Sequence, residues 1–164
     1  MVCDAKLRIR NVIARWPGSV HDSTIFNDSP LCAQFERSDF VLLGYSGYPC
    51  RHYLLTPVLN PSTLAEEAYN KAQILSRNPI ERLFGVLKRR FPCLHVGLGL
   101  NIQNIPPIIV ACAVLHNIAL SRQDNMFEED TALNSVEDLQ NPEIINEGNE
   151  NFIVRSAIIN THFA

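Results

Sequence analysis

The spacing of apolar residues changes at Pro61, and this change constrains the fold more than any other feature of the sequence. Before Pro61, short apolar runs end at turn-forming residues, as in VCDA, LRIRNVIARW and the continuous run 40–44 (FVLLG). Such runs predict short strands, and the fully apolar run predicts a buried central strand. Residues 19–37 predict two short helices, the second opening at Ser29 and Pro30.

After Pro61 the apolar residues recur at helical spacing. Residues 63–77, 79–91 and 106–122 predict three helices, the first two separated at Asn78 and Pro79, and residues 151–164 predict an amphipathic terminal helix. Strands followed by helices in this order indicate an α/β or α+β architecture. The residues predicted to face inward are Leu64, Ala68, Ala72, Leu75, Ile80, Leu83, Phe84, Leu87, Phe91, Ile108, Ala111, Cys112, Leu115 and Ile118.

The length leaves room for one globular domain with a core, or for two very small ones. The 164 residues are 46% hydrophobic and 19% charged, which excludes a disordered or fibrous chain. The longest apolar stretch, Ile105 to Leu115, is too short to span a bilayer, and the first ten residues lack an apolar signal core, so we predict neither a membrane nor a secretory route. Five scattered cysteines without a C-x-x-C pair predict reduced thiols in an intracellular compartment.

Charge is distributed unevenly along the chain. Residues 1–123 have a net charge of +5, whereas residues 124–164 have a net charge of −8. A basic body suits an anionic partner, and the acidic extension either shields that body or is a solvated linker without a further role. The stretch 124–150 is polar, acidic and poor in aromatic residues, which predicts disorder.

Phosphate-binding loops, zinc-protease motifs and nucleophile elbows do not occur in the sequence, and the five dispersed histidines form no zinc pattern. Six other motifs occur in a definite order: PGSVHDSTIF (17–26), LLGYSGYP (42–49), LLTP (54–57), AEEAYNKA (65–72), RNPIERLFGVLKRRF (77–91) and ACAVLHNIAL (111–120). Together they resemble the Harbinger/PIF family of DDE transposases and the domesticated Harbinger transposase-derived nucleases. The ending RSAIINTHF also resembles the terminus of these nucleases.

This resemblance implies an RNase H-like α/β fold over residues 1–123, missing its first strand region, followed by the acidic linker 124–150 and the helix 151–164. In such a fold, carboxylates at strand ends and on a following helix hold Mg²⁺ or Mn²⁺, hard cations that prefer oxygen ligands. Two such ions activate water and stabilise the leaving oxygen of a DNA phosphodiester. The resemblance also implies a Myb/SANT-like DNA-binding partner and a location in the nucleus and cytoplasm.

The family's site residues carry over to this sequence only in part. Glu81 in NPIERLFG matches the catalytic glutamate, and Asp22 in GSVHDS matches an acidic position associated with the metal. The family's central aspartate lies in a motif LLGD-x-GYP, where this sequence has Tyr45, and the 35 residues 46–80 match the usual spacing to the glutamate. The family's first aspartate lies upstream of the region resembling VCDAKLRI, so we expect it to be absent here.

We expect the helix carrying Glu81 to pack near the carboxyl end of strand 40–43, close to Asp22 and Tyr45. We also expect an open strand edge and exposed apolar surface, because the upstream strand is expected to be missing. DNA binding is expected to be weak, independent of sequence and steeply salt-dependent, and to strengthen on removal of 124–150 if that stretch masks the basic surface. The basic residues expected to contact DNA are Arg82, Lys88, Arg89 and Arg90.

Each of these residues also has a structural interpretation. Glu81 lies three positions after Asn78, as in a capping box. Asp22 suits a helix N-terminus, and residues 88–90 suit a solvated helix C-terminus. Two further polar residues are expected to be structural: His116 as a hydrogen-bonded core residue and Asp4 as a surface residue.

Two functions remain open. The first is a divalent-metal-dependent DNA nuclease domain with lost or weak activity, because the Tyr45 phenol is neutral near pH 7 and replaces a carboxylate. The alternative is a non-catalytic derivative that binds DNA or protein. A truncated product of an active parent is disfavoured, because truncation does not explain the tyrosine. We expect no cleavage above background with Mg²⁺ or Mn²⁺, and rescue only when aspartate at position 45 is combined with an added first strand.

Overall fold

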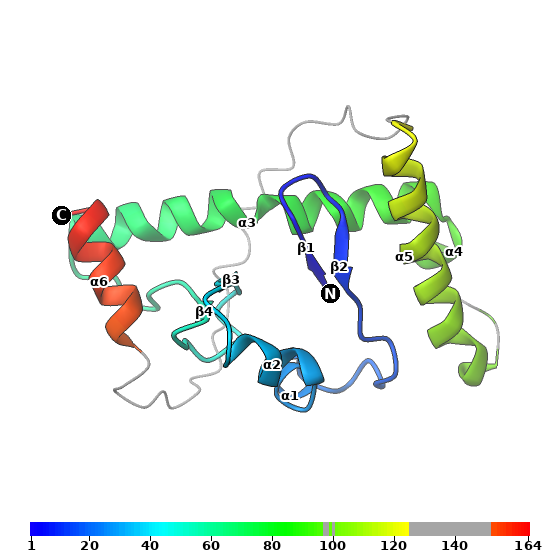
Figure 1. The fold of residues 1–164 in the computed structure, drawn as a ribbon, viewed down its shortest axis with the longest axis horizontal. Helices are drawn as coiled ribbons and strands as arrows, with labels where there is room; N and C mark the ends of the chain where they lie inside the picture. Colours follow the sequence, from blue (N-terminus) through cyan, green and yellow to red (C-terminus); the bar gives the residue numbers. More distant parts are fainter. Residues whose placement is uncertain (97–98, 100, 125–151) are drawn as a thin grey trace. The chain divides into compact units, whose positions relative to one another are not determined.

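The computed structural model describes residues 1–96, 99, 101–124 and 152–164, which fold into two compact units (Figure 1). Unit 1 comprises Met1–Pro17 and Asn78–Ser135, and unit 2 comprises Gly18–Arg77 and Val136–Ala164. The long helix α3 (Leu64–Arg90) contributes its first half to unit 2 and its second half to unit 1. Apart from Asp124, the predicted linker 124–150 lies outside the described residues.

Unit 1 packs a short hairpin and helices around one apolar core. Strands β1 (Val2–Cys3) and β2 (Ile9–Asn11) pair antiparallel, which confirms the two predicted N-terminal strands, although the second is shorter than expected. After α3 come α4 (Cys93–Val96), the 3₁₀ turn η1 (Ile102–Asn104) and α5 (Ile105–Ser121). The buried core residues of unit 1 are Leu7, Ile9, Leu83, Val86, Leu87 and Ala113.

Asp4 shapes the turn of this hairpin. Its carboxylate accepts hydrogen bonds from the backbone N–H groups of Lys6 (2.9 Å) and Arg8 (3.0 Å), and it pairs with the Arg10 guanidinium at 2.9 Å. The turn holds Leu7 at a φ of 60°, a left-handed conformation uncommon for leucine, and directs its side chain into the core. Partial burial raises the pKa of Asp4, but the N–H groups and Arg10 outweigh it, so the pKa lies below its ordinary value.

Two polar residues of α5 attach this helix to the hairpin. His116 is fully buried, with Nε2 2.9 Å from the Leu7 carbonyl oxygen and Nδ1 3.3 Å from the Arg90 guanidinium. A neutral ring protonated on Nε2 satisfies both contacts. Asn117 accepts from the N–H of Ile9 and donates to its carbonyl, each at 2.9 Å, much as a neighbouring strand would. The prediction of a hydrogen-bonded core histidine is confirmed.

The buried face of α5 differs from the predicted one. Cys112, Ala113 and His116 are buried, whereas Leu115 and Ile118 are 53% and 44% exposed. The imidazole needs buried partners, and this requirement outweighs the apolar pattern in setting the rotation of the helix. The helical stretch Ile102–Ser121 contains an 18-residue window with a mean hydropathy of 1.5, of which 17% is buried. By length and composition alone this stretch could cross a membrane, contrary to the prediction from the apolar run 105–115.

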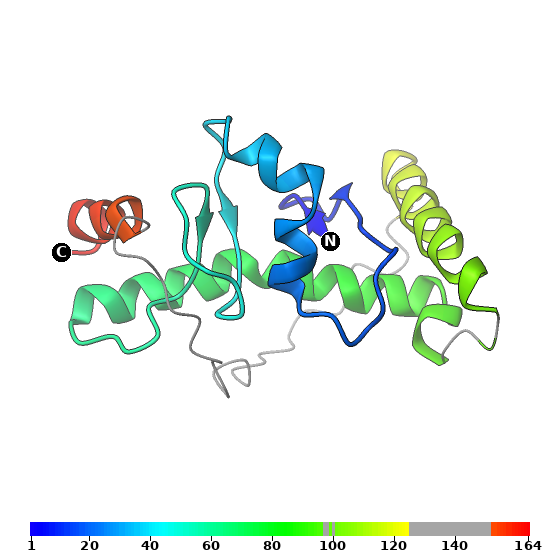
Figure 2. The same cartoon turned by 90° about the horizontal axis from the view of Figure 1, so that it is seen from below.

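Unit 2 contains two short helices, two short strands and the terminal helix, in addition to the first half of α3 (Figure 2). Helices α1 (Asp22–Asn27) and α2 (Pro30–Phe35) confirm the two predicted helices, and Ser29 caps α2 by accepting from the Cys32 N–H at 3.3 Å. Strands β3 (Leu42–Leu43) and β4 (Leu54–Leu55) form a parallel pair, and α6 (Ile153–His162) is the helix predicted at 151–164. The buried core residues are Phe26, Cys32, Tyr53 and Leu54.

The apolar run 40–44 is not the buried central strand that the sequence predicts. Only Leu42 and Leu43 have strand conformation, and β4 is their one strand neighbour among the residues that the structure describes. Phe40 is 76% exposed and Val41 is 47% exposed. A two-stranded sheet cannot cover both faces of an apolar run, which accounts for the exposure of Phe40 and Val41. Whether a missing upstream strand leaves an open edge stays a prediction.

Helix α3 is continuous from Leu64 to Arg90, so the predicted break at Asn78 and Pro79 is wrong. Pro79 lacks one helical N–H, and residues on both sides of it are buried, Tyr69 and Gln73 before it and Leu83 and Val86 after it. In the first half of α3, the predicted inward residues Leu64 and Leu75 are 83% and 59% exposed. Tyr69 and Gln73 are buried instead, because they hydrogen-bond with buried backbone groups. In the second half of α3, Phe84 was predicted to face inward but is exposed. Val86, which was not predicted to face inward, is buried in the core of unit 1.

Candidate metal and nucleic-acid site

Asp22 and Tyr45 meet in unit 2. Asp22 is the first residue of α1, with His21 at the N-cap position, and Tyr45 follows β3. The Tyr45 hydroxyl donates a hydrogen bond to Asp22 Oδ2 at 3.2 Å. Because His21 occupies the N-cap position, Asp22 is not the N-cap residue. Its carboxylate in the first turn still favours the helix. One of the Asp22 oxygens that could bind a cation therefore accepts a hydrogen bond from a phenol instead.

Three neighbours hold the Tyr45 ring in this position. The Tyr48 ring lies edge-on at 5.1 Å between centroids, and the Arg77 guanidinium lies 5.6 Å from the Tyr45 ring centroid. A Cβ atom added to Gly47 would lie only 2.7 Å from Tyr45 Cζ, so a side chain at position 47 would displace the ring. Burial, and then the negative charge of Asp22, raise the pKa of Tyr48 above its ordinary value, so this phenol is neutral.

The first half of α3 fixes the backbone around this cluster. Gln73, which is 3% exposed, donates to the carbonyl of Gly44, the residue before Tyr45, at 2.7 Å. Asn70 accepts from the N–H of Val58 and donates to its carbonyl, each at 2.8 Å. Asn70, in the motif AEEAYNKA, and Gln73, directly after that motif, therefore act as a clamp on the backbone segments that flank β3 and β4.

Helix α6 adds a buried cation to unit 2. Arg155 is 8% exposed and donates to the carbonyls of Thr56 (3.3 Å) and Pro57 (3.1 Å), with its guanidinium 4.7 Å from the Phe152 ring centroid. The Tyr69 hydroxyl donates to the same Thr56 carbonyl at 3.1 Å. Arg155 is the one basic residue of 124–164, and its charge is used within the fold.

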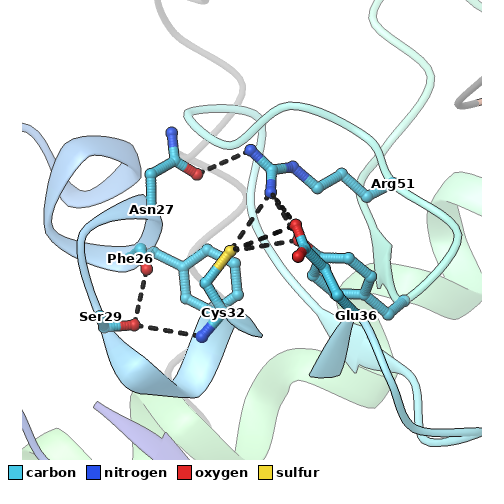
Figure 3. A network of polar contacts seen from close by, with 7 residues as sticks. Phe26, Asn27, Ser29, Cys32, Glu36 and Arg51 are labelled. Atoms are coloured by element: carbon cyan, nitrogen blue, oxygen red, sulfur yellow. Dashed lines mark hydrogen bonds and ion pairs between the residues drawn. The ribbon is translucent and has the colours of Figure 1, made fainter. Parts of the chain in front are cut away.

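A second polar network joins α1 and α2 to the segment before β4 (Figure 3). The Arg51 guanidinium donates to Asn27 Oδ1 at 2.7 Å and to Cys32 Sγ at 3.3 Å, and it lies 3.6 Å from the Glu36 carboxylate. The Tyr53 hydroxyl lies 3.2 Å from the same sulfur. This network fixes the helix that carries Asp22 relative to the segment after β3.

Glu81 lies in the second half of α3, within unit 1. It is exposed and lies inside a continuous helix, so its interpretation as a capping residue is wrong. Arg82, Lys88 and Arg89 are also exposed, and the seven-residue spacing places Lys88 two turns along the helix from Glu81. Gly85 lies between these side chains, and a Cβ atom there would meet only Arg89 Nη1, at 3.9 Å. This basic face, defined by Arg82, Lys88 and Arg89, surrounds one carboxylate.

Arg90 faces the interior of unit 1 instead. Its side chain is 8% exposed, donates to the Asp124 carbonyl at 2.9 Å and lies 3.6 Å from the Asp124 carboxylate. The same guanidinium contacts His116. The predicted DNA contact of Arg90 would require these bonds to open, and it stays a prediction.

The metal prediction can be compared with the donor set. Asp22 and Tyr45 belong to unit 2 and Glu81 belongs to unit 1, so their convergence stays a prediction. Within the described part of either unit, no group of three or more His, Cys, Asp or Glu side chains could hold a metal ion. A two-ion site needs several carboxylates, so Asp22 with a phenol on one oxygen does not fit Mg²⁺ or Mn²⁺ at this position.

Sequence reasoning did not find the residues that position this cluster. Gln73, Asn70 and Arg51 are polar, and the apolar pattern assigns no role to such residues. One signal was available for α3: Tyr69 and Gln73 are four residues apart, so they lie on one helical face. No comparable signal marks Arg51 or Arg155, whose partners lie in backbone segments distant in the sequence.

Comparison with known proteins shows which family the chain is similar to. The family of DDE superfamily endonucleases matches residues 1–117. Human "Putative nuclease HARBI1" is 41% identical over 127 residues, which is 73% of this chain and 36% of the relative. The Xenopus laevis protein of the same name is 30% identical over 100% of this chain and 49% of the relative, and Arabidopsis thaliana "Protein ALP1-like" is 27% identical over 78% and 36%. No solved structure gives a significant match.

The chain belongs to the DDE superfamily endonucleases. Its similarity to the HARBI1 proteins confirms the resemblance to the Harbinger transposase-derived nucleases. The chain spans between about a third and a half of the length of these relatives, at 36% and 49%. Enzymes of this superfamily generally use divalent metal ions.

Proposed function

We propose that this chain is a derivative of a Harbinger-type nuclease domain that binds the DNA backbone, with divalent-metal-dependent cleavage lost or weak. The supporting observation is the 3.2 Å hydrogen bond from Tyr45 to Asp22, at the position where the family resemblance implies an aspartate. We also propose that the mixed helices and small sheets are part of an RNase H-like fold.

The chemistry explains why this hydrogen bond matters. Two-ion cleavage depends on carboxylates that hold both cations while water attacks in line. Tyrosine in place of aspartate removes one negative charge and up to two oxygen ligands, and the phenol is neutral near pH 7. An ion bound by Asp22 and water would be positioned too loosely to orient the attacking water.

Charge supports the DNA-binding part of the proposal. Residues 1–17 and 78–124, in unit 1, contain nine Lys/Arg and three Asp/Glu, a net charge of +6. Residues 18–77 and 152–164, in unit 2, contain five Lys/Arg and six Asp/Glu, a net charge of −1. Binding to a polyanion through Arg82, Lys88 and Arg89 therefore involves unit 1, and it depends on counterion release.

Two assays on the full chain test the proposal. Nicking of supercoiled plasmid with Mn²⁺ is compared with and without EDTA, for the native chain and for Glu81→Gln. Binding to a short DNA duplex is measured at low salt for the native chain, for Lys88→Glu/Arg89→Glu, and for the control Lys71→Glu on an exposed position of unit 2. We expect binding without nicking, and weaker binding only for the double variant. EDTA-sensitive nicking that Glu81→Gln abolishes, or no binding at low salt, would contradict the proposal.

The alternative function is protein binding. Contacts with phosphates carry no sequence information, so a chain that binds DNA through its backbone needs another source of target specificity. We propose a Myb/SANT-like DNA-binding protein as that partner, in the nucleus and cytoplasm. Co-purification with such a partner after loss of DNA binding in Lys88→Glu/Arg89→Glu would separate the two roles.

A further inference from the structure

Helix α5 has an apolar and exposed outer face in unit 1. Its residues recur every three or four positions, so they lie on one side of the helix: Pro107, Val110, Ala111, Val114, Leu115 and Ile118. All six are exposed, Val114 by 52% and Leu115 by 53%. The helix Ile105–Ser121 contains no Lys, Arg, Asp or Glu. A contiguous apolar face of this kind marks an interaction surface.

The opposite side of α5 holds the helix in unit 1. His116 and Asn117 bond the backbone of Leu7 and Ile9 in the hairpin, each at 2.9 Å. A helix that crossed a bilayer would lose these bonds and bring a polar imidazole into hydrocarbon. A helix lying on a membrane surface is typically rich in Lys and Arg, which α5 lacks. The outer face therefore suits an apolar protein surface better than lipid.

We propose that the outer face of α5 binds the same face of a second copy of this chain, as an antiparallel helix pair with two-fold symmetry. The axis passes between positions 112 and 113. Each helix then places Val110 opposite Leu115, Ala111 opposite Val114, and Pro107 opposite Ile118 of the other copy. The proposal rests on α5 alone and does not depend on DNA binding.

The order of residues along α5 favours this register. A two-fold interface requires each residue to meet a complementary residue of the other copy. The small Ala111 lies beside the axis, which lets the two helices approach closely, and the bulkier side chains pack on either side of it. Beyond the apolar face, Gln103 lies near Arg122 of the other copy, and both are exposed. A parallel pair would instead bring the two Arg122 side chains together, and these like charges repel each other.

The exposed area is sufficient for a weak dimer. A fully exposed residue of these sizes has roughly 130–200 Å² of accessible surface, so the outer face leaves roughly 450 Å² per copy. Pairing of two copies then buries roughly 900 Å² in total, in the range of weak and transient complexes below about 1,200 Å². We therefore expect a dissociation midpoint of about 10–100 µM.

Sedimentation equilibrium of the full chain measures this association. Reducing conditions are needed, because Cys93 is exposed and could form disulfides between copies. We expect a monomer–dimer equilibrium without larger assemblies, since a two-fold interface is closed. Leu64→Glu is the control, because Leu64 is an apolar residue of unit 2 with 83% exposure outside α5. We expect its midpoint to match that of the native chain.

Charged variants of one opposed pair test the register. Val110→Lys and Leu115→Glu each place unpaired charges in the dimer, so we expect each to raise the midpoint at least about tenfold. In an equimolar mixture of the two variants, the new ammonium of one copy lies opposite the new carboxylate of the other. We expect this mixture, and the double variant Val110→Lys/Leu115→Glu, to associate more tightly than either single variant. Thermal unfolding checks that every variant folds.

A native chain that stays monomeric at about 500 µM would overturn the proposal, because this concentration exceeds the expected midpoint. Single variants that associate as tightly as the native chain, or a mixture and a double variant no tighter than the single variants, would also overturn it. Sedimentation with phosphatidylcholine vesicles tests the lipid alternative, and we expect the native chain to stay in the supernatant. Vesicle binding that Leu115→Glu abolishes would assign the outer face to a membrane and overturn the proposal.

Discussion

At the scale of residues, the Tyr45 phenol bonds one oxygen of Asp22 at a position where the family resemblance implies a second carboxylate. In the native chain, Asp22 Oδ2 accepts a hydrogen bond from the Tyr45 hydroxyl. Tyr48, Arg77 and the absence of a side chain at Gly47 keep the Tyr45 ring in place. Tyr45→Asp removes the ring and adds a second carboxylate to the same cluster. We expect Mn²⁺ affinity to rise about tenfold, which corresponds to ~1.4 kcal/mol, as measured by titration calorimetry or by Mn²⁺ spin resonance.

The matched control is Tyr45→Phe. It removes the hydroxyl that bonds Asp22 and keeps the ring, so it frees the carboxylate without adding a second one. We expect Mn²⁺ binding by Tyr45→Phe to stay near the native level. Equal affinity in the native chain and in Tyr45→Asp would show that the missing carboxylate at position 45 does not limit metal binding at Asp22.

Asp4 gives unit 1 a pH-dependent contribution to stability. The pKa of Asp4 in the folded chain lies below its ordinary value, because the N–H groups of Arg8 and Lys6 and the Arg10 guanidinium outweigh partial burial. Its contribution is therefore complete above about pH 4, the ordinary pKa of aspartate, and is lost as the pH falls toward the folded pKa.

Asp4→Asn tests this contribution, because the amide oxygen can still accept from the backbone but carries no charge. We expect the urea midpoint of Asp4→Asn to lie below that of the native chain at pH 7, with the difference shrinking below about pH 4. Asp39→Asn, on an exposed position of unit 2, is the control. If the difference in urea midpoint between Asp4→Asn and the native chain were independent of pH, the charge of the Asp4 carboxylate would not contribute to stability.

At the scale of elements, side-chain hydrogen bonds to backbone hold α3 against the rest of unit 2. Asn70 satisfies both the N–H and the carbonyl of Val58, so Asn70→Ala leaves two partly buried backbone groups without this partner. We expect a loss of about 1–3 kcal/mol in the free energy of unfolding, measured by urea denaturation. Lys71→Ala, one position along on the exposed side of α3, is the matched control, and we expect its effect to stay within about 0.5 kcal/mol. Similar losses in both variants would argue against the clamp.

The elements also show what the sequence could and could not predict. The paired strands at the N-terminus, the two helices at 19–37 and the terminal helix follow from local signals such as turn residues and the Ser29 cap. The inward faces of α3 and α5 do not, because Gln73 and His116 bury polar groups whose backbone partners are distant in the sequence. The apolar period indicates that a helix is present, whereas such partners determine its rotation.

The candidate site shows the same limit. Motif order alone pointed to Asp22, Tyr45 and Glu81, and the structure brings the first two together. The direct bond between them could not be predicted, because it depends on the path of residues 44–58 over α3, which Gln73 and Asn70 fix. The continuous helix through Pro79 could not be predicted either, since proline after asparagine is typical of a helix start.

At the scale of the whole molecule, the charge differs between three parts of the chain, more sharply than the division into residues 1–123 and 124–164 indicates. The described part of unit 1 has a net charge of +6 and that of unit 2 has −1, while residues 125–151 contain eight Asp/Glu and no Lys/Arg. The acidic residues can therefore compete with DNA for the basic face of α3. This competition is independent of catalysis, so it can be measured whether or not the chain cleaves DNA.

Replacing the eight acidic residues of 125–151 with Gln and Asn tests this competition without changing the length of the chain. We expect tighter binding to a short DNA duplex at low salt, because the neutral segment no longer competes with phosphates for Arg82, Lys88 and Arg89.

In the native chain, Lys88→Gln/Arg89→Gln should lower the slope of log affinity against log salt by about 1.8 if both residues contact phosphates. The same pair in the neutralised chain should remove most of the gain, whereas Lys71→Gln in unit 2 should not. Unchanged affinity after neutralisation would show that the acidic segment does not mask the basic face.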